Sequence, residues 1–225
     1  MLQTYTLREK KILTSDVFLL KFSIDIVVQN PLHWQFITFI LPNGLWGRSY
    51  SILNFKDGIF ELIIKRLENG KWGSKYICDL PVGWELKGVG AAWHFVLQKN
   101  NKNKLFLWTG TGFVPLYYQI LGSIESALDC KLKMIFWVRT LSDMFFEQEL
   151  EEIKEKNPQF SYDLYLTQEQ KDWYHFWRIT SKITVDSILG FEEFYICGSP
   201  MMVDDMLEIL QSLWIQKEQI FTEKY

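Results

Sequence analysis

The signals for strands and helices change character near residue 100, and this change constrains the fold more than any other feature. Before it, short runs of β-branched and aromatic residues are separated by turn signals such as Pro42-Asn43-Gly44 and Asp57-Gly58. Strands are expected at residues 4–7, 17–22, 36–40, 50–53 and 60–64. Many short strands without helices between them predict a small barrel or a sandwich.

After a polar connector at residues 101–104, strands and helices alternate. Strands are expected at residues 105–108, 134–138, 162–166 and 193–196, and helices at residues 114–128, 143–156 and 201–213. This alternation predicts an α/β domain with a doubly wound parallel sheet. A chain of 225 residues is long enough for two modest domains, and we expect them at residues 1–99 and 100–225.

The distribution of charged residues along the chain indicates which kinds of partner molecule suit the protein. Residues 1–100 carry 12 basic and 8 acidic residues, whereas residues 101–225 carry 12 basic and 19 acidic ones. A basic first half suits cofactor phosphates or an acidic partner protein, although an uneven solvated surface is as good an explanation. The acidic overall balance, without a basic patch interleaved with aromatic residues, argues against nucleic acid. No apolar run approaches the ~18–20 residues of a membrane span.

The cysteine content indicates the compartment. Cys78, Cys130 and Cys197 are odd in number, far apart and without CxxC spacing. They favour a reducing cytoplasm and argue against structural disulfides or a zinc site. An iron–sulfur domain is excluded, because it needs four clustered cysteines. The first residues lack the apolar core of a signal peptide, so we expect a cytoplasmic protein.

Three motifs lie at the ends of expected strands. Residues 48–51 read Arg-Ser-Tyr-Ser and combine a cation that binds phosphate bidentately with a planar ring and two hydroxyls. Residues 109–112 read Thr-Gly-Thr-Gly between a strand and a helix, where backbone N–H groups face an anion. Residues 197–200 read Cys-Gly-Ser-Pro in the same context. In an open α/β sheet, the last two motifs line one crevice.

The ordered set of motifs resembles the ferredoxin-NADP reductase family from about Tyr5 to Tyr225. The resemblance implies an N-terminal antiparallel β-barrel that binds FAD and a C-terminal α/β domain that binds NADH or NADPH. It implies a flavin-dependent NAD(P)H oxidoreductase, in which a hydride passes from nicotinamide C4 to flavin N5. The electrons then pass to a separate acceptor, such as a ferredoxin, a flavodoxin or an oxygenase component.

The resemblance also implies which residues form the site. It implies catalytic roles for Ser51, Cys197 and Glu223. It implies cofactor contacts from Arg48, Ser49, Tyr50, Ser51, Lys65, Gly73, Ser74, Thr109, Gly110, Thr111, Gly112, Pro115, Arg139, Cys197, Gly198, Pro200, Met201 and Tyr225. In this scheme Arg48 binds the flavin pyrophosphate, Tyr50 packs against the flavin and Ser51 hydrogen-bonds its N5 atom.

Several of these residues have plain structural alternatives. Ser74 also suits the N-cap of a helix after an ordinary turn. Cys197 is expected near nicotinamide C4, but a lone buried cysteine is usually an inert small hydrophobe. Arg139 suits the nucleotide or the bare surface equally well. For Glu223 as a proton relay and Tyr225 as a ring over the flavin, the alternative is a frayed tail.

Two positions depart from the family pattern. The usual Gly-Pro-x-Gly-x-Phe at the end of the barrel reads Gly-Ala-Ala-Trp-His-Phe at residues 90–95, so this loop is remodelled and His94 is expected to be structural. NADPH-specific members commonly have Ser-Arg where residues 167–169 read Thr-Gln-Glu. A carboxylate there suits a ribose diol and disfavours a 2′-phosphate, which favours NADH.

Two other functions remain open at this point. One is an NAD(P)H:flavin reductase that uses flavin as a substrate and releases it reduced. The other is a non-catalytic binding module that kept the fold, for which the altered loop at residues 90–95 is the sole support.

Overall fold

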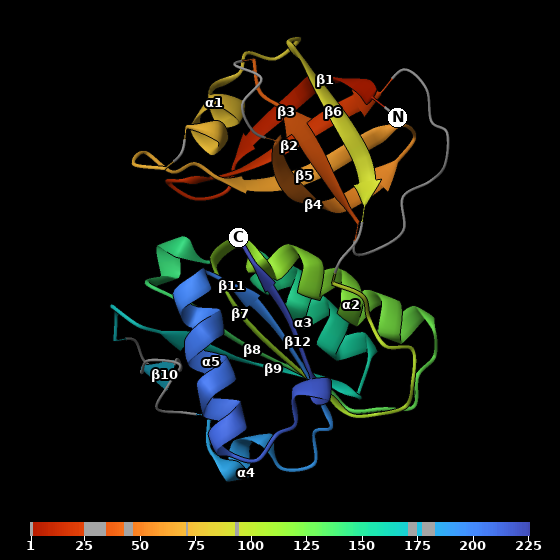
Figure 1. Cartoon of the computed structure of the whole chain (residues 1–225), viewed down its shortest axis with the longest axis vertical. Coiled ribbons are helices and arrows are strands. Elements are labelled where there is room, and N and C mark those ends of the chain that lie inside the picture. Colours follow the sequence, from red (N-terminus) through yellow and green to blue (C-terminus); the bar gives the residue numbers. More distant parts are fainter. Residues whose placement is uncertain are drawn as a thin grey trace. The chain divides into compact units, whose positions relative to one another are not determined.

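The computed structural model describes residues 2–24, 35–42, 47–70, 72–92, 95–170, 175–176 and 183–225. The chain forms two compact units, Met1–Val96 and Leu97–Tyr225, and each is described by itself (Figure 1). Asn43 and Gly44 of one expected turn, and His94 of the altered loop, lie outside the described residues.

The first unit is a closed barrel with the strand order β1-β2-β5-β4-β3-β6, and every neighbouring pair is antiparallel (Figure 1). Its strands are β1 (Leu2–Ile12), β2 (Val17–Ile24), β3 (Phe36–Ile40), β4 (Gly47–Lys56), β5 (Ile59–Lys65) and β6 (Glu85–Ala92). A short helix, α1 (Gly73–Asp79), follows β5. The expected barrel is confirmed, and closure removes the sheet edges that a sandwich would leave.

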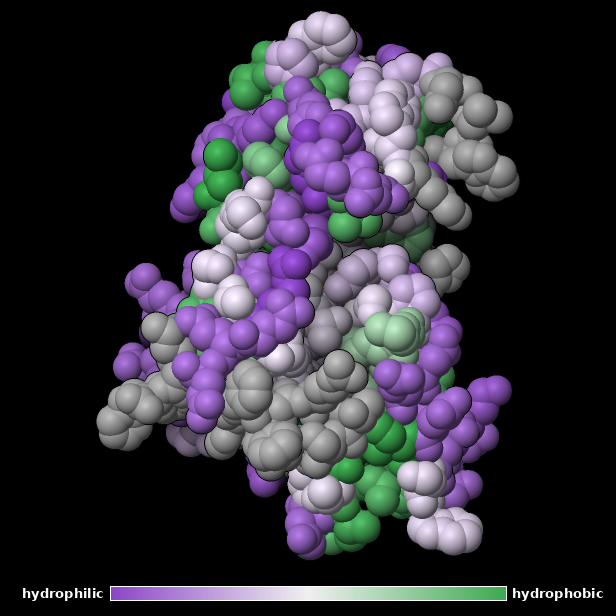
Figure 2. All heavy atoms as spheres, turned by 90° about the vertical axis from the view of Figure 1, so that its left-hand side faces the viewer, coloured by the Kyte–Doolittle hydropathy of each residue, from purple (hydrophilic) through white to green (hydrophobic). Residues whose placement is uncertain are grey.

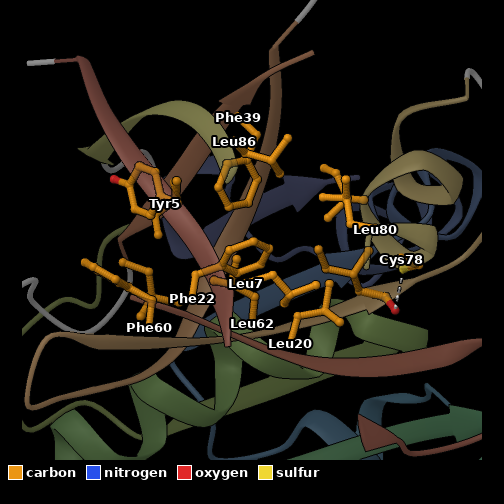
Figure 3. Close-up of a cluster of buried hydrophobic side chains, with 14 of the residues drawn as sticks. Tyr5, Leu7, Leu20, Phe22, Phe39, Phe60, Leu62, Cys78, Leu80 and Leu86 are labelled. Carbon is orange, nitrogen blue, oxygen red and sulfur yellow. Dashed lines mark hydrogen bonds between the residues drawn. The ribbon is translucent and has the colours of Figure 1, made fainter. Parts of the chain in front are cut away.

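Inward-pointing aromatic and aliphatic side chains fill the barrel (Figure 3). The Tyr5 ring meets Phe39 edge-on at 5.4 Å and Phe60 at 5.7 Å between ring centroids. Leu7 and Leu62 are completely buried beside them. Interiors packed in this way resist rearrangement, so the barrel fixes the position of β4 and its polar motif.

Strand β6 has no clear signal in the sequence, because two of its residues are glycines that weaken a strand pattern. A Cβ at Gly88 would lie 3.0 Å from the Tyr5 ring and 3.1 Å from the Thr38 carbonyl oxygen. A Cβ at Gly90 would lie 3.0 Å from the Tyr5 hydroxyl. The large ring of Tyr5 therefore explains why this strand is glycine-rich.

The second unit contains a parallel six-stranded sheet with the order β10-β9-β8-β7-β11-β12 (Figure 1). The strands are β7 (Lys104–Thr109), β8 (Leu132–Val138), β9 (Phe160–Leu166), β10 (His175–Phe176), β11 (Glu193–Gly198) and β12 (Ile220–Lys224). The helices are α2 (Phe113–Glu125), α3 (Glu147–Lys156), α4 (Val185–Ile188) and α5 (Pro200–Ser212). Short 3₁₀ turns are η1 (Gly110–Gly112), η2 (Leu141–Asp143) and η4 (Lys217–Gln219).

The side chains of successive residues in each strand point to opposite faces of the sheet. Trp108 packs on Phe113 of α2 at 5.2 Å between ring centroids, whereas Leu107 belongs to the apolar cluster that includes Val203 and Met206 of α5. Helices thus cover both faces, as expected for a doubly wound sheet. The carboxyl ends of parallel strands meet at one edge, which brings the turns after β7, β8, β9 and β11 together.

Two of the structural alternatives are ruled out, and one expected helix boundary is wrong. The chain end is not frayed, because Ile220–Lys224 forms strand β12 beside β11. The helix expected from residue 143 begins at Glu147, because Phe146 adopts φ 72° and Asp143 closes a capping box with Thr140. Ser74 is not an N-cap, because α1 begins at Gly73 and Trp72 occupies the cap position.

The opposite, amino-terminal end of this sheet carries an apolar surface over α4 and the end of α5 (Figure 2). Val185, Leu189 and Trp214 are exposed there. This surface lies away from the carboxyl edge that holds the motifs. Within the described part of the chain, no helix is long and apolar enough to cross a membrane.

Candidate functional site

The barrel brings Arg48 against the start of α1. A Cβ built on Gly73 would lie 2.7 Å from Cγ and 2.9 Å from Nε of Arg48, so the arginine stem occupies the space that glycine leaves. Nη1 of Arg48 donates to the Gly47 carbonyl at 3.0 Å. Two of the expected cofactor contacts, which are separate in the sequence, therefore touch in the fold.

The rest of the β4 motif divides between two faces. Arg48 and Tyr50 pair in register with Phe39 and Ile37, whose side chains are buried inside the barrel. Burial raises the pKa of Tyr50 far above its usual range, so Tyr50 stays a neutral ring against the core.

Ser49 and Ser51 alternate with these residues and belong to the other face of β4. Ser49 Oγ lies 2.9 Å from Thr38 Oγ1, and Ser51 pairs in register with Phe36. The arginine and the aromatic ring therefore share one face, while the two hydroxyls share the other.

Two other expected cofactor contacts near α1, Lys65 and Ser74, bond to other residues. Lys65 Nζ pairs with Asp16 Oδ2 at 3.0 Å. Ser74 Oγ accepts a hydrogen bond from the Leu67 amide at 3.2 Å.

In the second unit, the two glycine motifs pack directly on each other. A Cβ at Gly112 would lie 2.5 Å from the carbonyl oxygen and 3.1 Å from Sγ of Cys197. A Cβ at Gly198 would lie 2.6 Å from Thr109 Oγ1 and would overlap Met202 Cε. Gly112 therefore needs glycine for close approach to backbone, whereas the neighbours of Gly198 are side-chain atoms, of which the end of Met202 can shift.

Cys197 lies in a row of register partners across the sheet, with Trp108 on β7 and Glu223 on β12. Burial raises the pKa of the Cys197 thiol well above its usual range, and the nearby Glu223 raises it further. Burial likewise raises the pKa of Glu223. The row thus presents a neutral thiol and a carboxyl group that tends to keep its proton.

Trp108 is a member of this row that the sequence motifs do not mark. It is 1% exposed, and its indole N–H has no hydrogen-bond partner among the described residues. An unsatisfied buried donor is unusual and calls for a physical reason. Its position directly before the Thr109 turn is the signal that sequence reasoning passed over.

Two helices begin at this edge. Ser199 caps α5, where its Oγ accepts from the Met202 amide at 3.4 Å, and Pro200 occupies the first turn. Met201 is 75% exposed beside it. Pro115 is buried in the first turn of α2. Free N–H groups at a helix start favour anions, so both turns suit a phosphate-bearing ligand.

Tyr225 also reaches this edge. Its hydroxyl donates to the Thr109 carbonyl oxygen at 2.7 Å, and its amide donates to the Gly198 carbonyl oxygen at 3.3 Å. A Cβ at Gly110, which has φ +55°, would lie 2.7 Å from the Tyr225 hydroxyl. Tyr225 therefore contacts the glycine turn itself.

The turns after β8 and β9 are tied to each other. Arg139 Nη2 pairs with Asp143 Oδ1 at 2.8 Å, and Glu169 Oε2 accepts from the Leu141 amide at 2.9 Å. Burial alone would raise the pKa of Asp143, but hydrogen bonds from Arg139 and Thr140 outweigh it and lower that pKa. Two carboxylates and one arginine therefore gather at this corner of the edge.

The raised pKa of Glu223 leads to a test of stability. The unfolded chain releases this proton at lower pH than the folded protein, so stability present below the unfolded pKa is lost as the pH rises through the folded pKa. Replacing Glu223 with glutamine is expected to raise the melting temperature at pH 8. The gain should vanish at about pH 3.5, below the ordinary glutamate pKa of about 4.3. Thermal denaturation at both pH values checks this, and an equal change at both would contradict it.

Comparisons with known proteins identify relatives of this chain. A family model described as an oxidoreductase NAD-binding domain matches residues 106–208. Ferredoxin--NADP reductase B of Sorangium cellulosum is 26% identical over 204 residues, which cover 85% of this chain and 83% of that protein. NADH-cytochrome b5 reductase 1 of Dictyostelium discoideum is 29% identical over 171 residues, covering 73% of this chain and 59% of that protein. The chain spans about half the length of the Na(+)-translocating NADH-quinone reductase subunits that it also matches.

A solved structure extends the likeness to both units. The ferredoxin NADP+ reductase from Neisseria gonorrhoeae, with bound FAD and NADP, superimposes with a TM-score of 0.82 at 19% identity. The match covers 99% of this chain and 98% of that one. At this identity the likeness establishes the fold, and the family model adds a nicotinamide nucleotide-binding domain.

Proposed function

Because the chain belongs to the ferredoxin-NADP reductase-like family of oxidoreductases, we propose that it is a flavin-dependent NAD(P)H oxidoreductase with a separate electron acceptor. The observation that carries the proposal is the packing of Gly112 on Cys197, which joins two glycine turns at the carboxyl edge of one parallel sheet. Open α/β sheets bind their ligands at this edge.

The residues of the barrel fit an FAD. Arg48 is held against Gly73 with its planar cation at the strand end, which suits bidentate binding of a pyrophosphate. Tyr50 presents a neutral ring on the same face of β4. Ser51, on the other face, offers a hydroxyl for the flavin ring edge. When bound, the flavin supplies a ring that accepts a hydride and releases electrons singly or in pairs.

The residues of the α/β unit fit a nicotinamide nucleotide. The N–H groups of the Gly110–Gly112 turn and of the start of α2 would hold the pyrophosphate. Gly198, which has no side chain of its own at the strand end, would let a planar ring lie close to the backbone there. Cys197, the buried residue before Gly198, would help to orient the ring and to keep water away from it.

Glu223 is positioned to handle a proton in this scheme. It is the register partner of Cys197, and burial raises its pKa, so it holds a proton more firmly than an exposed carboxyl does. A carboxyl group poised in this way suits general acid or base chemistry. The thiol of Cys197 stays protonated and acts by its shape and position.

The electron acceptor is a separate molecule in this proposal. Similar proteins are named for ferredoxin–NADP and for NADH–quinone chemistry, so we propose an electron-transfer protein or an oxygenase component as the acceptor here. The basic first half of the sequence favours an acidic protein partner. A cytoplasmic location stays a prediction from the cysteine content.

We expect a preference for NADH over NADPH. The corner that follows β8 and β9 carries the carboxylates of Asp143 and Glu169, and Arg139 is already paired with Asp143. A 2′-phosphate there meets negative charge, whereas a ribose diol can donate to it. The ratio of kcat/KM for the two nucleotides measures the preference. Glu169→Arg should shift the ratio toward NADPH, and an NADPH preference in the wild type would reverse the assignment.

Two measurements on the purified chain test the function. The chain is loaded with FAD, passed over gel filtration and assayed for NADH oxidation with ferricyanide. The proposal predicts that the flavin stays with the protein and that ferricyanide is reduced. Loss of the flavin, with activity restored by free flavin, would identify a flavin reductase instead. If NADH is oxidised neither by the FAD-loaded chain nor in the presence of free flavin, the chain is a non-catalytic binding module.

A further inference from the structure

Phe146, the residue before α3, has a backbone conformation that aromatic residues rarely adopt. Its φ angle is 72°, in the left-handed region that favours glycine. A residue held there costs free energy and persists only where the surrounding structure outweighs that cost. Strain of this kind is concentrated at functional sites, so the contacts of this side chain call for an explanation.

The ring of Phe146 packs on the residue that follows the glycine turn. It stacks on the Phe113 ring with 4.8 Å between centroids and an interplanar angle of 25°. The neighbouring Phe145 ring meets Phe113 edge-on at 6.0 Å. Consecutive side chains of an extended segment point to opposite sides, so the change of backbone direction at Phe146 allows both rings to reach Phe113.

Phe113 connects these rings to the candidate site. It is fully buried, begins α2 and comes directly after Gly112. It also packs on Trp108 at 5.2 Å between centroids, and Trp108 is the register partner of Cys197. Phe113 therefore cannot move without moving the end of the glycine turn.

The segment that ends at Phe146 is also fixed at the corner after β8 and β9. Arg139 Nη2 pairs with Asp143 Oδ1 at 2.8 Å, and the Leu141 amide donates to Glu169 Oε2 at 2.9 Å. Polar contacts thus hold the first part of this segment, and the Phe113 ring holds its last residue. Phe146 thereby joins this corner to the glycine turn.

We propose that Phe146 is a positioning residue for the nucleotide: its ring, placed on Phe113 by the strained backbone, holds the Gly110–Gly112 turn in the conformation that accepts a pyrophosphate. The proposal rests on the proposed function, because the turn that it concerns is the proposed nucleotide site. Phe146 needs no contact with the nucleotide and acts through Phe113.

The aromatic packing sets the size of the expected effect. The stabilisation that one aromatic pair contributes corresponds to a factor of roughly 2–10 in an equilibrium constant. Without the ring of Phe146, the binding conformation of the turn loses up to this share of its population. The apparent affinity for the nucleotide then falls by the same factor.

Binding of ADP-ribose to the full chain tests the proposal, because ADP-ribose carries the pyrophosphate but no nicotinamide. Phe146→Asn removes the ring, and asparagine tolerates the left-handed backbone. Calorimetry should show ADP-ribose binding roughly 2–10-fold more weakly to Phe146→Asn. The KM for NADH should rise by the same factor while kcat stays unchanged. Phe146→Tyr keeps the ring and should behave as the wild type does.

Trp214 provides the matched control. It has a φ angle of 68° and is 86% exposed on the apolar surface away from the carboxyl edge of the sheet. Trp214→Asn makes the same kind of replacement in the same backbone conformation, so it should leave the affinity for ADP-ribose unchanged. Equal losses of affinity in Phe146→Asn and Trp214→Asn would overturn the proposal.

A double-mutant cycle tests whether Phe146 acts through Phe113. Phe113→Leu keeps a buried apolar side chain but loses the stacked ring. In that background, Phe146→Asn should weaken ADP-ribose binding little further, because both changes remove the same contact. A full additional loss of affinity would contradict this route.

The outcomes separate this proposal from the proposed function. Unchanged ADP-ribose affinity and unchanged KM in Phe146→Asn would overturn the positioning role while leaving the nucleotide site intact. Absence of ADP-ribose binding in the wild type would overturn both. Weaker ADP-ribose binding by Phe146→Asn, in a chain whose wild type fails to oxidise NADH, would uphold the positioning role and remove the enzyme.

Discussion

Replacing Gly112 with alanine is expected to weaken binding of NADH at least tenfold and to destabilise the protein by about 1–3 kcal/mol, the usual cost of overpacking. The added Cβ would lie 2.5 Å from the Cys197 carbonyl oxygen, which belongs to the backbone of a central strand. That atom cannot rotate away, so the turn itself must move. Titration calorimetry and denaturant unfolding measure the two effects.

Gly122, on the helix α2 that follows the turn, provides the matched control. A Cβ there would meet Leu97 Cδ2 at 3.5 Å, which is ordinary van der Waals contact. Alanine in a helix interior is favoured over glycine by roughly 1 kcal/mol, so Gly122→Ala should keep nucleotide affinity and hold or raise stability. Equal affinity in Gly112→Ala and Gly122→Ala would mean that the turn does not touch the nucleotide.

Replacing Arg48 with alanine is expected to weaken FAD binding by about 1.5–3 kcal/mol, the range for hydrogen bonds to a charged group. The structure holds this arginine against Gly73, where its stem fills the space of a missing Cβ. Arg48 is only partly buried, so its removal takes away the cation without emptying a fully buried position. Fluorescence titration with FAD measures the change.

Three further variants show whether FAD binding depends on the charge of Arg48, on the shape of its guanidinium group or on its position in the barrel. Arg48→Lys keeps the charge but loses the planar fork, so it should recover part of the affinity. Gly73→Ala would push against Arg48 Cγ and should weaken FAD binding although the arginine is intact. Arg8, which donates to Ser23 Oγ at 2.7 Å, is the control, and Arg8→Ala should bind FAD normally. Normal FAD binding by Arg48→Ala would remove the β4 motif from the flavin site.

Much of the architecture follows from local sequence patterns. Short β-branched runs before residue 100 predicted the barrel, and alternating strands and helices after it predicted the parallel sheet. Strand β6 was not predicted, because Gly88 and Gly90 interrupt the pattern of β-branched and aromatic residues. The Tyr5 ring nevertheless leaves room for no larger residue at these two positions. Strand β12 was not predicted either. Its five residues are stabilised by pairing with β11 and not by their own propensity to form a strand.

The site was predictable as a set of motifs but not as a set of contacts. Local pattern marked Arg48, Gly73, Gly112 and Cys197, yet their meeting in pairs is a property of the fold. Lys65 pairs with Asp16, a long-range partner that no local motif indicates.

The hydrogen bonds of Ser74 Oγ and the Tyr225 hydroxyl likewise depend on packing. Ser74 Oγ bonds to Leu67, seven residues earlier, and the Tyr225 hydroxyl bonds to Thr109, which lies 116 residues before it. Such partners are set by the closed barrel and the sheet, which the linear sequence does not display.

The most direct test of the account is an anaerobic absorbance measurement in a stopped-flow instrument. The flavin-loaded chain is mixed with NADH in the absence of any acceptor. We predict that the visible flavin band is bleached in a single turnover, and that Gly112→Ala slows this bleaching at a fixed NADH concentration. A flavin band that stays unchanged while NADH binds to the protein would contradict the central claim that this chain transfers a hydride between the two cofactors.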